Sequence, residues 1–153
     1  MSHTTTIKSV PIRDEKAIAA AVSFLVSNGI SCSLARNEAP RAYYQNQTGL
    51  GVADLVLKLH NSRYDVGLYK QQDGTFQPRT DFWAGEVAKQ IGFVPTDAEK
   101  STMSQDELSA LNIGKFTQAY AAQATYLEAC AQGHNAEIIQ GDNGRLLVEI
   151  TTY

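Results

Sequence analysis

Arginine, lysine and aromatic residues gather around two polar stretches of the sequence, and their types suit an anionic ligand that carries a planar ring. Guanidinium groups bind phosphate or carboxylate through paired N–H donors, and aromatic rings stack on bases. One group lies in the loop after residue 34, and the other lies on a predicted hairpin and just beyond it. The candidate ligand-binding residues are Arg36, Arg41, Tyr43, Tyr44, Tyr69, Lys70, Phe76, Arg79 and Trp83.

If this loop binds the ligand, Arg41→Ala and Tyr44→Ala should abolish binding and leave the melting temperature nearly unchanged. The alternative is that the arginines are simply solvated and that the aromatic residues pack in the interior. Phe82 and Trp83 could also form an exposed apolar stripe, which would suit an adaptor that docks on a partner protein.

Two tripeptides of the form His-x-Ser/Thr, at residues 3–5 and 60–62, suggest a different chemistry. Two imidazoles that flank one phosphorus atom can act as base and acid, as in a two-histidine phosphoesterase, if they lie within about 8 Å of each other. The catalytic set of this alternative would be His3, Thr5, His60 and Ser62. One tripeptide lies at the chain terminus and the other in a predicted turn, so surface histidines are the simpler interpretation.

Other catalytic or cofactor signatures are not found in the sequence. Its three histidines lie in different predicted elements without metal-ligand spacing, and Gly49-Leu50-Gly51 lacks the residues of a phosphate-binding loop. Cys32 and Cys130 are expected to be reduced packing residues. We therefore expect no metal and no cofactor, and a non-enzymatic protein is favoured without an enzyme being excluded.

Composition places the chain among ordinary globular proteins. Its 153 residues are 43% hydrophobic and 19% charged, and they fit one domain over residues 1–153. No apolar run reaches the roughly 20 residues of a membrane span, and no signal peptide is visible, so a cytoplasmic location without membrane contact is expected. A net charge of −3 argues against binding extended nucleic acid.

The stretch from residue 53 to residue 83 predicts a three-stranded meander. A two-residue turn at residues 61–62 would give the cross-strand pairs Leu59 with Tyr64, Leu57 with Val66, and Leu55 with Leu68, all on one apolar face. On the other face, Lys58 is expected to pair with Asp65. A second turn at Asp73-Gly74 would place Tyr69 and Phe76 opposite the leucines, on a face that either binds the ligand or packs under a helix.

The periodicity of apolar residues predicts helices before and after this meander. An amphipathic helix begins after Asp14 and ends at Gly29, a second ends at Gly92, and the longest covers residues 115–132. A capping box is expected at Ser104 and Glu107, within a polar, insertion-like segment near residues 95–114. Strands are expected at residues 4–12 and 30–34 and in a terminal hairpin, where Ile139, Leu146, Val148 and Ile150 would share a face. The predicted fold is α+β, with one antiparallel or mixed sheet of about six or seven strands packed by three to four helices.

Several stretches resemble an uncharacterised domain-of-unknown-function family encoded in plastids and cyanobacteria, with relatives in phages. The similar stretches are the opening Met1-Ser2-His3, DLVLKL, YDVGLYKQQDGTFQPRTDFW, KFTQAYAAQATYLEACAQG and NGRLLVEI. The resemblance implies an α+β domain, an intracellular setting that includes phage-encoded members, and an accessory role beside an ATPase. It implies no reaction.

The sequence as a whole favours a binding protein that forms homo-oligomers and binds or sequesters a small anionic, nucleotide-like ligand through its Arg and aromatic loops. The alternatives are an adaptor or accessory subunit that binds a protein partner, and the two-histidine phosphoesterase.

Overall fold

The computed structural model describes residues 2–6 (backbone only), 11–42, 50–81, 85–141 and 144–151. The strands are β1 (Ser2–Thr6), β2 (Cys32–Glu38), β3 (Ala53–Leu59), β4 (Val66–Lys70), β5 (Phe76–Thr80), β6 (Asn135–Gln140) and β7 (Leu146–Thr151). The helices are α1 (Glu15–Ser27), α2 (Glu86–Ile91), α3 (Asp97–Thr102), α4 (Gln105–Ala110) and α5 (Gly114–Ala131), with a short 3-10 turn η2 (Leu111–Ile113) before α5.

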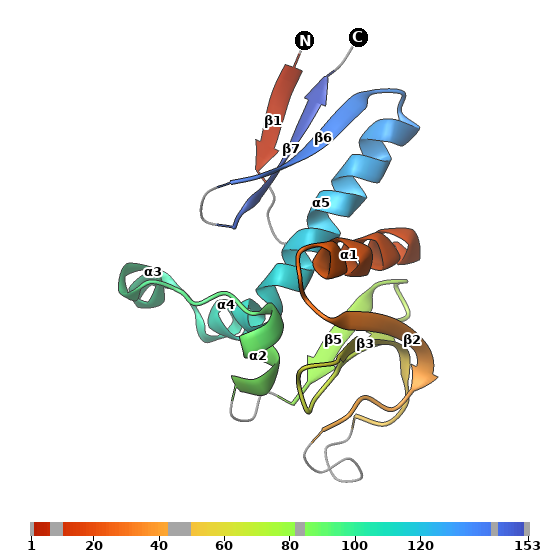
Figure 1. Cartoon of the computed structure of the whole chain (residues 1–153), viewed down its shortest axis with the longest axis vertical. Helices are drawn as coiled ribbons and strands as arrows, with labels where there is room; N and C mark the ends of the chain where they lie inside the picture. Colours follow the sequence, from red (N-terminus) through yellow and green to blue (C-terminus); the bar gives the residue numbers. More distant parts are fainter. Residues whose placement is uncertain (1, 7–10, 43–49, 82–84, 142–143, 152–153) are drawn as a thin grey trace.

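The strands form two separate antiparallel sheets with α1 and α5 between them (Figure 1). One sheet has the order β1-β7-β6 and the other the order β2-β3-β4-β5. The α+β class is therefore confirmed, whereas the expectation of a single sheet is wrong. The reason is that the terminal hairpin β6–β7 pairs with the N-terminal strand and not with the meander.

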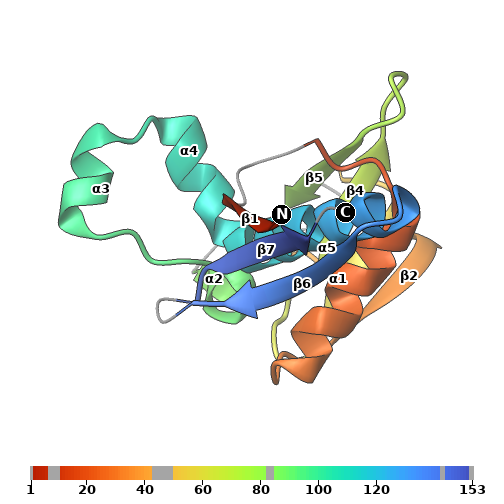
Figure 2. The same cartoon turned by 90° about the horizontal axis from the view of Figure 1, so that it is seen from above.

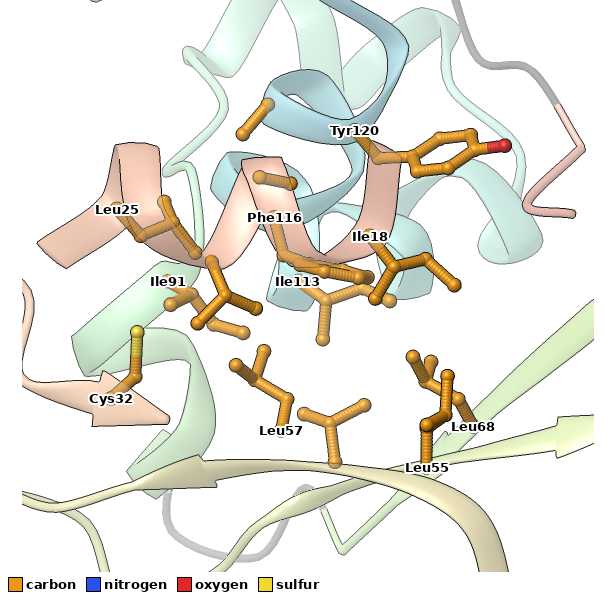
Figure 3. Packing of buried hydrophobic residues seen from close by; sticks show 14 of the residues in the cluster. Ile18, Leu25, Cys32, Leu55, Leu57, Leu68, Ile91, Ile113, Phe116 and Tyr120 are labelled. Carbon is orange, nitrogen blue, oxygen red and sulfur yellow. The ribbon is translucent and has the colours of Figure 1, made fainter. Parts of the chain in front are cut away.

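The meander follows the predicted register, with Leu55 opposite Leu68 and Leu57 opposite Val66. Its leucine face forms the floor of the main core, and Ile18 of α1 and Phe116 of α5 lie over it (Figure 3). All six of these side chains are at most 1% exposed. Burying a large apolar side chain stabilises a fold by about 1.5–3 kcal/mol, so this layer contributes much of the free energy of folding.

Two expectations about the meander are wrong. Phe76 lies on the leucine side and belongs to the main core, because β5 pairs Pro78 with Leu68 and residues two apart on a strand share a face. Lys58 does not pair with Asp65. Its ammonium lies 2.6 Å from the Glu38 carboxylate, while Asp65 is buried and binds elsewhere.

The start of α1 is fixed from both sides. Asp14 caps the helix by accepting a hydrogen bond from the Lys16 amide at 2.9 Å, as the sequence predicted. The hydroxyl of Tyr120, on the buried side of α5, accepts hydrogen bonds from the amides of Arg13 and Asp14 at 2.9 and 3.0 Å. Two backbone donors at the helix entrance are thereby satisfied, and α1 is held against α5.

The terminal hairpin differs from the expected pattern by one residue. Ile138 faces Val148 and packs with it on α5, whereas Ile139 is paired with Leu147 on the other face. The cause is the connection between Gly141 and Arg145, which has an odd number of residues and shifts the strand by one position relative to a turn of two or four. Cys130, expected to be a packing residue, is exposed near the end of α5.

Helices α3 and α4 form an arm that extends away from the two sheets (Figures 1 and 2). Neither helix contains a buried residue. Each is held by a capping box, Thr96 with Glu99 in α3 and Ser104 with Glu107 in α4, and the second of these was predicted. Within the described residues, no helix is long and apolar enough to cross a membrane.

Candidate functional site

Arg41, the central residue of the predicted ligand-binding loop, binds a carboxylate of the same chain. Its guanidinium forms two hydrogen bonds with the Asp65 carboxylate, Nε to Oδ2 at 3.0 Å and Nη2 to Oδ1 at 2.8 Å, and Nη2 also donates to the Leu59 carbonyl. The backbone amides of Arg41 and Leu59 donate to the same carboxylate. The Asp65 side chain is fully buried, so Arg41 ties the loop to the β3–β4 turn. The hydrogen bond to Asp65 raises the pKa of Arg41.

The other predicted ligand-binding residues do not gather around Arg41. Arg36 forms an exposed ion pair with Glu15 at 2.8 Å, and the exposed Lys70 lies at the end of β4. Phe76 is in the core. Tyr43, Tyr44 and Trp83, like Phe82, lie outside the described residues.

Tyr69 and Arg79 are the two predicted residues that the structure brings together. The Arg79 guanidinium lies 5.3 Å from the centre of the Tyr69 ring, which is cation–π geometry. The ring also covers Gly67, where an added Cβ would lie only 2.7 Å from a ring carbon. Burial raises the pKa of Tyr69, and the nearby Arg79 charge partly offsets this shift. The pair therefore covers the outer face of the four-stranded sheet, because α1, α2 and α5 pack on the leucine side.

The two histidine tripeptides belong to different sheets. His3 and Thr5 are in β1, while His60 follows β3, and its Nε2 lies 2.9 Å from the Ser33 hydroxyl. Ser62 is buried, and its hydroxyl accepts a hydrogen bond from the Tyr64 amide, which is a local turn contact. The tripeptides thus lack the adjacent strands that the two-histidine mechanism supposes. Among the described residues, no cluster of three or more His, Cys, Asp or Glu side chains could hold a metal ion.

A cleft that the sequence did not indicate lies between the end of α1, the start of α5 and the β6–β7 hairpin, and we call it the inner cleft. Its volume is about 230 Å³. Two aromatic rings and four polar side chains line it, together with parts of the hairpin: Phe24, Phe93, Asn28, Lys115, Gln118 and Gln140. The amides can donate and accept hydrogen bonds, and the rings offer faces for stacking. Within the described part of the chain, Lys115 forms no ion pair.

A second depression adjoins the inner cleft at Phe93, and we call it the outer hollow. It has a volume of about 280 Å³ and a wall that is mainly apolar, made by Phe93, Val94, Pro95 and Leu111. Glu99 and Arg145 stand at its polar side, with Oε2 and Nη2 3.5 Å apart. Each depression is smaller than the roughly 300 Å³ at which typical ligand pockets begin.

Phe93, the wall shared by both depressions, is held in place by two contacts. Its amide donates to the Leu111 carbonyl at 2.9 Å, and its ring lies on Gly114, where an added Cβ would be 2.6 Å from a ring carbon. Glycine at this position therefore lets the aromatic ring reach the helix backbone. The side chain is only partly buried and keeps some accessible surface.

The residues of the inner cleft come from α1, the segment after α2, α5 and β6, so no single stretch of sequence brings them together. The one sign of the cleft in the sequence is the spacing of two polar residues on α5. Lys115 and Gln118 are three residues apart and therefore lie on one side of α5, next to the buried stripe that contains Phe116 and Ala119. Polar side chains at the border of a core-facing stripe are a weak sign of a polar pocket.

Comparison with known proteins gives no relative: no family model, no curated protein and no solved structure matches this chain.

Proposed function

We propose that this chain is a non-enzymatic binding protein that takes a small anionic ligand with a planar ring, such as a nucleotide, in the inner cleft. The observation that carries the proposal is the combination of two phenylalanine rings, three amide side chains and one unpaired ammonium group around a single cleft, among the residues described. A nucleobase offers one face for stacking and one edge of donors and acceptors. The ammonium of Lys115 supplies the charge that a phosphate or carboxylate group requires.

This location differs from the one that the sequence favoured. Arg41 and Phe76 have structural roles, and Arg36 and Arg79 are engaged by Glu15 and Tyr69. The type of ligand stays the same, while the binding residues move to Lys115, Gln118 and their neighbours. The single ammonium group and the modest volume support a small ligand over an extended polyanion.

The proposal is tested by calorimetric titration of AMP into the wild type and two charge-reversed variants. Lys115→Glu changes the inner cleft, and Lys70→Glu makes the same change at an exposed position of the sequence-predicted site. Charge-assisted hydrogen bonds contribute about 1.5–3 kcal/mol, so Lys115→Glu should weaken AMP binding roughly tenfold or more. Lys70→Glu should leave the affinity unchanged.

Mass spectrometry of small molecules released by denaturing the purified protein provides an independent check. A stoichiometric nucleotide or similar anion would support the proposal. Two results would contradict it: AMP affinity that falls in Lys70→Glu but not in Lys115→Glu, or a protein that releases no small molecule and binds no AMP.

A further inference from the structure

The arm formed by α3 and α4 has little packing of its own. Each of the two helices has six residues, and neither contains a buried residue. Figure 2 shows both helices set apart from the two sheets. Isolated helices shorter than about 12–15 residues are marginal in water, and helices in proteins are stabilised mainly by packing an apolar face. The capping boxes therefore hold an arm that lacks the usual source of helix stability.

The arm also carries the excess negative charge of the chain. Residues 97–110 contain one ammonium group, that of Lys100, and four carboxylates, those of Asp97, Glu99, Asp106 and Glu107. Their formal charges add up to −3, which equals the net charge of the whole sequence, so the remaining residues are balanced. Within the described part of the chain, the exposed Asp97 and Asp106 form no ion pair.

An apolar surface adjoins these charges at the base of the arm. The wall of the outer hollow includes Phe93 and Val94, and its lining reaches the start of α3 through Thr96 and Glu99. Val94 is 91% exposed, the largest fraction among the exposed large hydrophobic residues described. A cavity of about 150 Å³ already holds a benzene molecule, so the hollow, at about 280 Å³, has room for a large apolar side chain.

The two features together indicate the chemistry of a partner. An apolar side chain in the hollow would cover Phe93 and Val94, and lysine or arginine residues next to it would balance the carboxylates of the arm. A second copy of this chain does not fit, because a symmetric contact through this surface would bring two arms of the same negative charge together. Nucleic acid is disfavoured by the same charge.

We propose that the arm and the outer hollow form a docking surface for a basic segment of another protein, which places an apolar side chain in the hollow. The partner supplies packing that α3 and α4 lack in the free chain, so the arm becomes more stable on docking. This interaction goes beyond the ligand binding proposed for the inner cleft and does not depend on it, because Lys115 and Gln118 take no part. Arg145 keeps its contact with Glu99, since Asp97 and Asp106 provide the charge.

The probe for the test is a synthetic peptide in which two leucines stand between two pairs of lysines. A counterpart with glutamates in place of the lysines is the control. Each peptide is titrated at low salt into the ¹⁵N-labelled full chain. The basic peptide should cause saturable shifts in the amide resonances of Val94 and of residues 97–110, and the acidic peptide should cause none. No binding of the basic peptide, or saturable shifts confined to other residues, would overturn the proposal.

Charge variants test the contribution of the arm. Asp97→Asn/Asp106→Asn removes two carboxylates and leaves both capping boxes intact, while Glu137→Gln/Glu149→Gln makes the same change on the three-stranded sheet. The first variant should bind the basic peptide about two- to tenfold more weakly, and the second should bind it like the wild type. An equal loss in both variants would mean non-specific attraction to negative charge and would overturn the proposal. Asp97→Lys/Asp106→Lys should gain binding of the acidic peptide, which unfolding of the arm could not produce.

Apolar variants test the contribution of the hollow. Val94→Ser removes the exposed apolar side chain of the wall, and the matched control is Val52→Ser, at a position that is also exposed. Loss of the apolar contact should weaken binding of the basic peptide about tenfold in Val94→Ser and leave it unchanged in Val52→Ser. Hydrogen exchange of the amides in residues 97–110 should slow at saturating peptide. Equal affinities of the two valine variants, or unchanged exchange in the arm, would contradict the docking surface.

Discussion

Arg41 and Arg145 both contact a carboxylate, and the two contacts differ in the burial of that carboxylate and in their distance. The partner of Arg41 is the fully buried Asp65, whose carboxylate accepts hydrogen bonds from two guanidinium nitrogens. The same carboxylate accepts a hydrogen bond from the Leu59 backbone amide. Arg145 contacts Glu99, a glutamate that is 44% exposed and whose Oε2 lies 3.5 Å from the Arg145 Nη2. The first contact fixes a loop, and the second lies at the rim of a depression.

The difference shows that the burial of the partner decides what an arginine can do. A buried carboxylate without its arginine would be left desolvated and uncompensated, so Arg41 cannot turn to a ligand without a large cost in free energy. An exposed carboxylate regains water when it is released, so the loss of its contact with an arginine costs little free energy. Arginine content alone, which drew attention to the loop around Arg41, does not distinguish the two cases.

The largest effect is expected from Arg41→Ala. The variant leaves the Asp65 carboxylate buried with only backbone donors, and because Arg41 itself is half-exposed we expect the free energy of unfolding to fall by about 2–4 kcal/mol. Urea denaturation followed by circular dichroism measures this. The matched control is Arg36→Ala, which removes an exposed pair with Glu15 and should shift the midpoint little. Equal midpoints for the two variants would mean that the Arg41 contact is as weak as a surface pair.

A smaller effect on stability is expected when the exposed pair of Arg145 with Glu99 is removed. Arg145→Ala should leave the melting temperature within about 2 °C of the wild type, because an exposed ion pair contributes little and α3 keeps its capping box. Differential scanning fluorimetry at low and high salt measures this change in melting temperature. A drop as large as that of Arg41→Ala would contradict the small contribution expected of an exposed ion pair.

The smallest effect concerns pH. The hydrogen bonds from Thr96, and to a lesser extent the Arg145 charge, hold the pKa of Glu99 below its ordinary value. A lowered folded-state pKa means that the contribution of Glu99 to the α3 cap is fully present above about pH 4.3, the ordinary glutamate pKa, and is lost as the pH falls through the lower folded value. A ¹³C titration of the Glu99 carboxyl should have its midpoint below that value and move slightly upward in Arg145→Gln. A midpoint above the ordinary value would contradict the capping role.

The meander was predictable because its signals are local. Alternating leucines determine which residues of β3 and β4 face each other, and the pairs of Leu55 with Leu68 and Leu57 with Val66 are confirmed. The expected two-residue turns are wrong, because residues 60–65 connect β3 to β4 and residues 71–75 connect β4 to β5. The α1 cap at Asp14 is local in the same sense. The one-residue error in the terminal hairpin arose where the connection had an odd length that composition does not reveal.

The partner of Asp65 and the inner cleft were not predictable in this way. Arg41 precedes Asp65 by 24 residues, and nothing between them shows that the loop returns to the β3–β4 turn. Lys58 was the nearest cation in the expected register and was therefore the natural but wrong partner. The cleft combines side chains that lie far apart in the sequence, such as Phe24, Phe93 and Gln140, and it is formed where the β6–β7 hairpin packs on α1 and α5.

The most direct test of the inner cleft as the binding site is to map where AMP binds. Titration of AMP into ¹⁵N-labelled protein should shift the amide or side-chain resonances of Asn28, Phe93, Lys115, Gln118 and Gln140, with Arg145 following at the rim. Resonances of Arg36, Tyr69 and Arg79 should stay in place. Shifts that cluster on the second set and leave the first unmoved would place the ligand on the four-stranded sheet and contradict the inner cleft as the binding site.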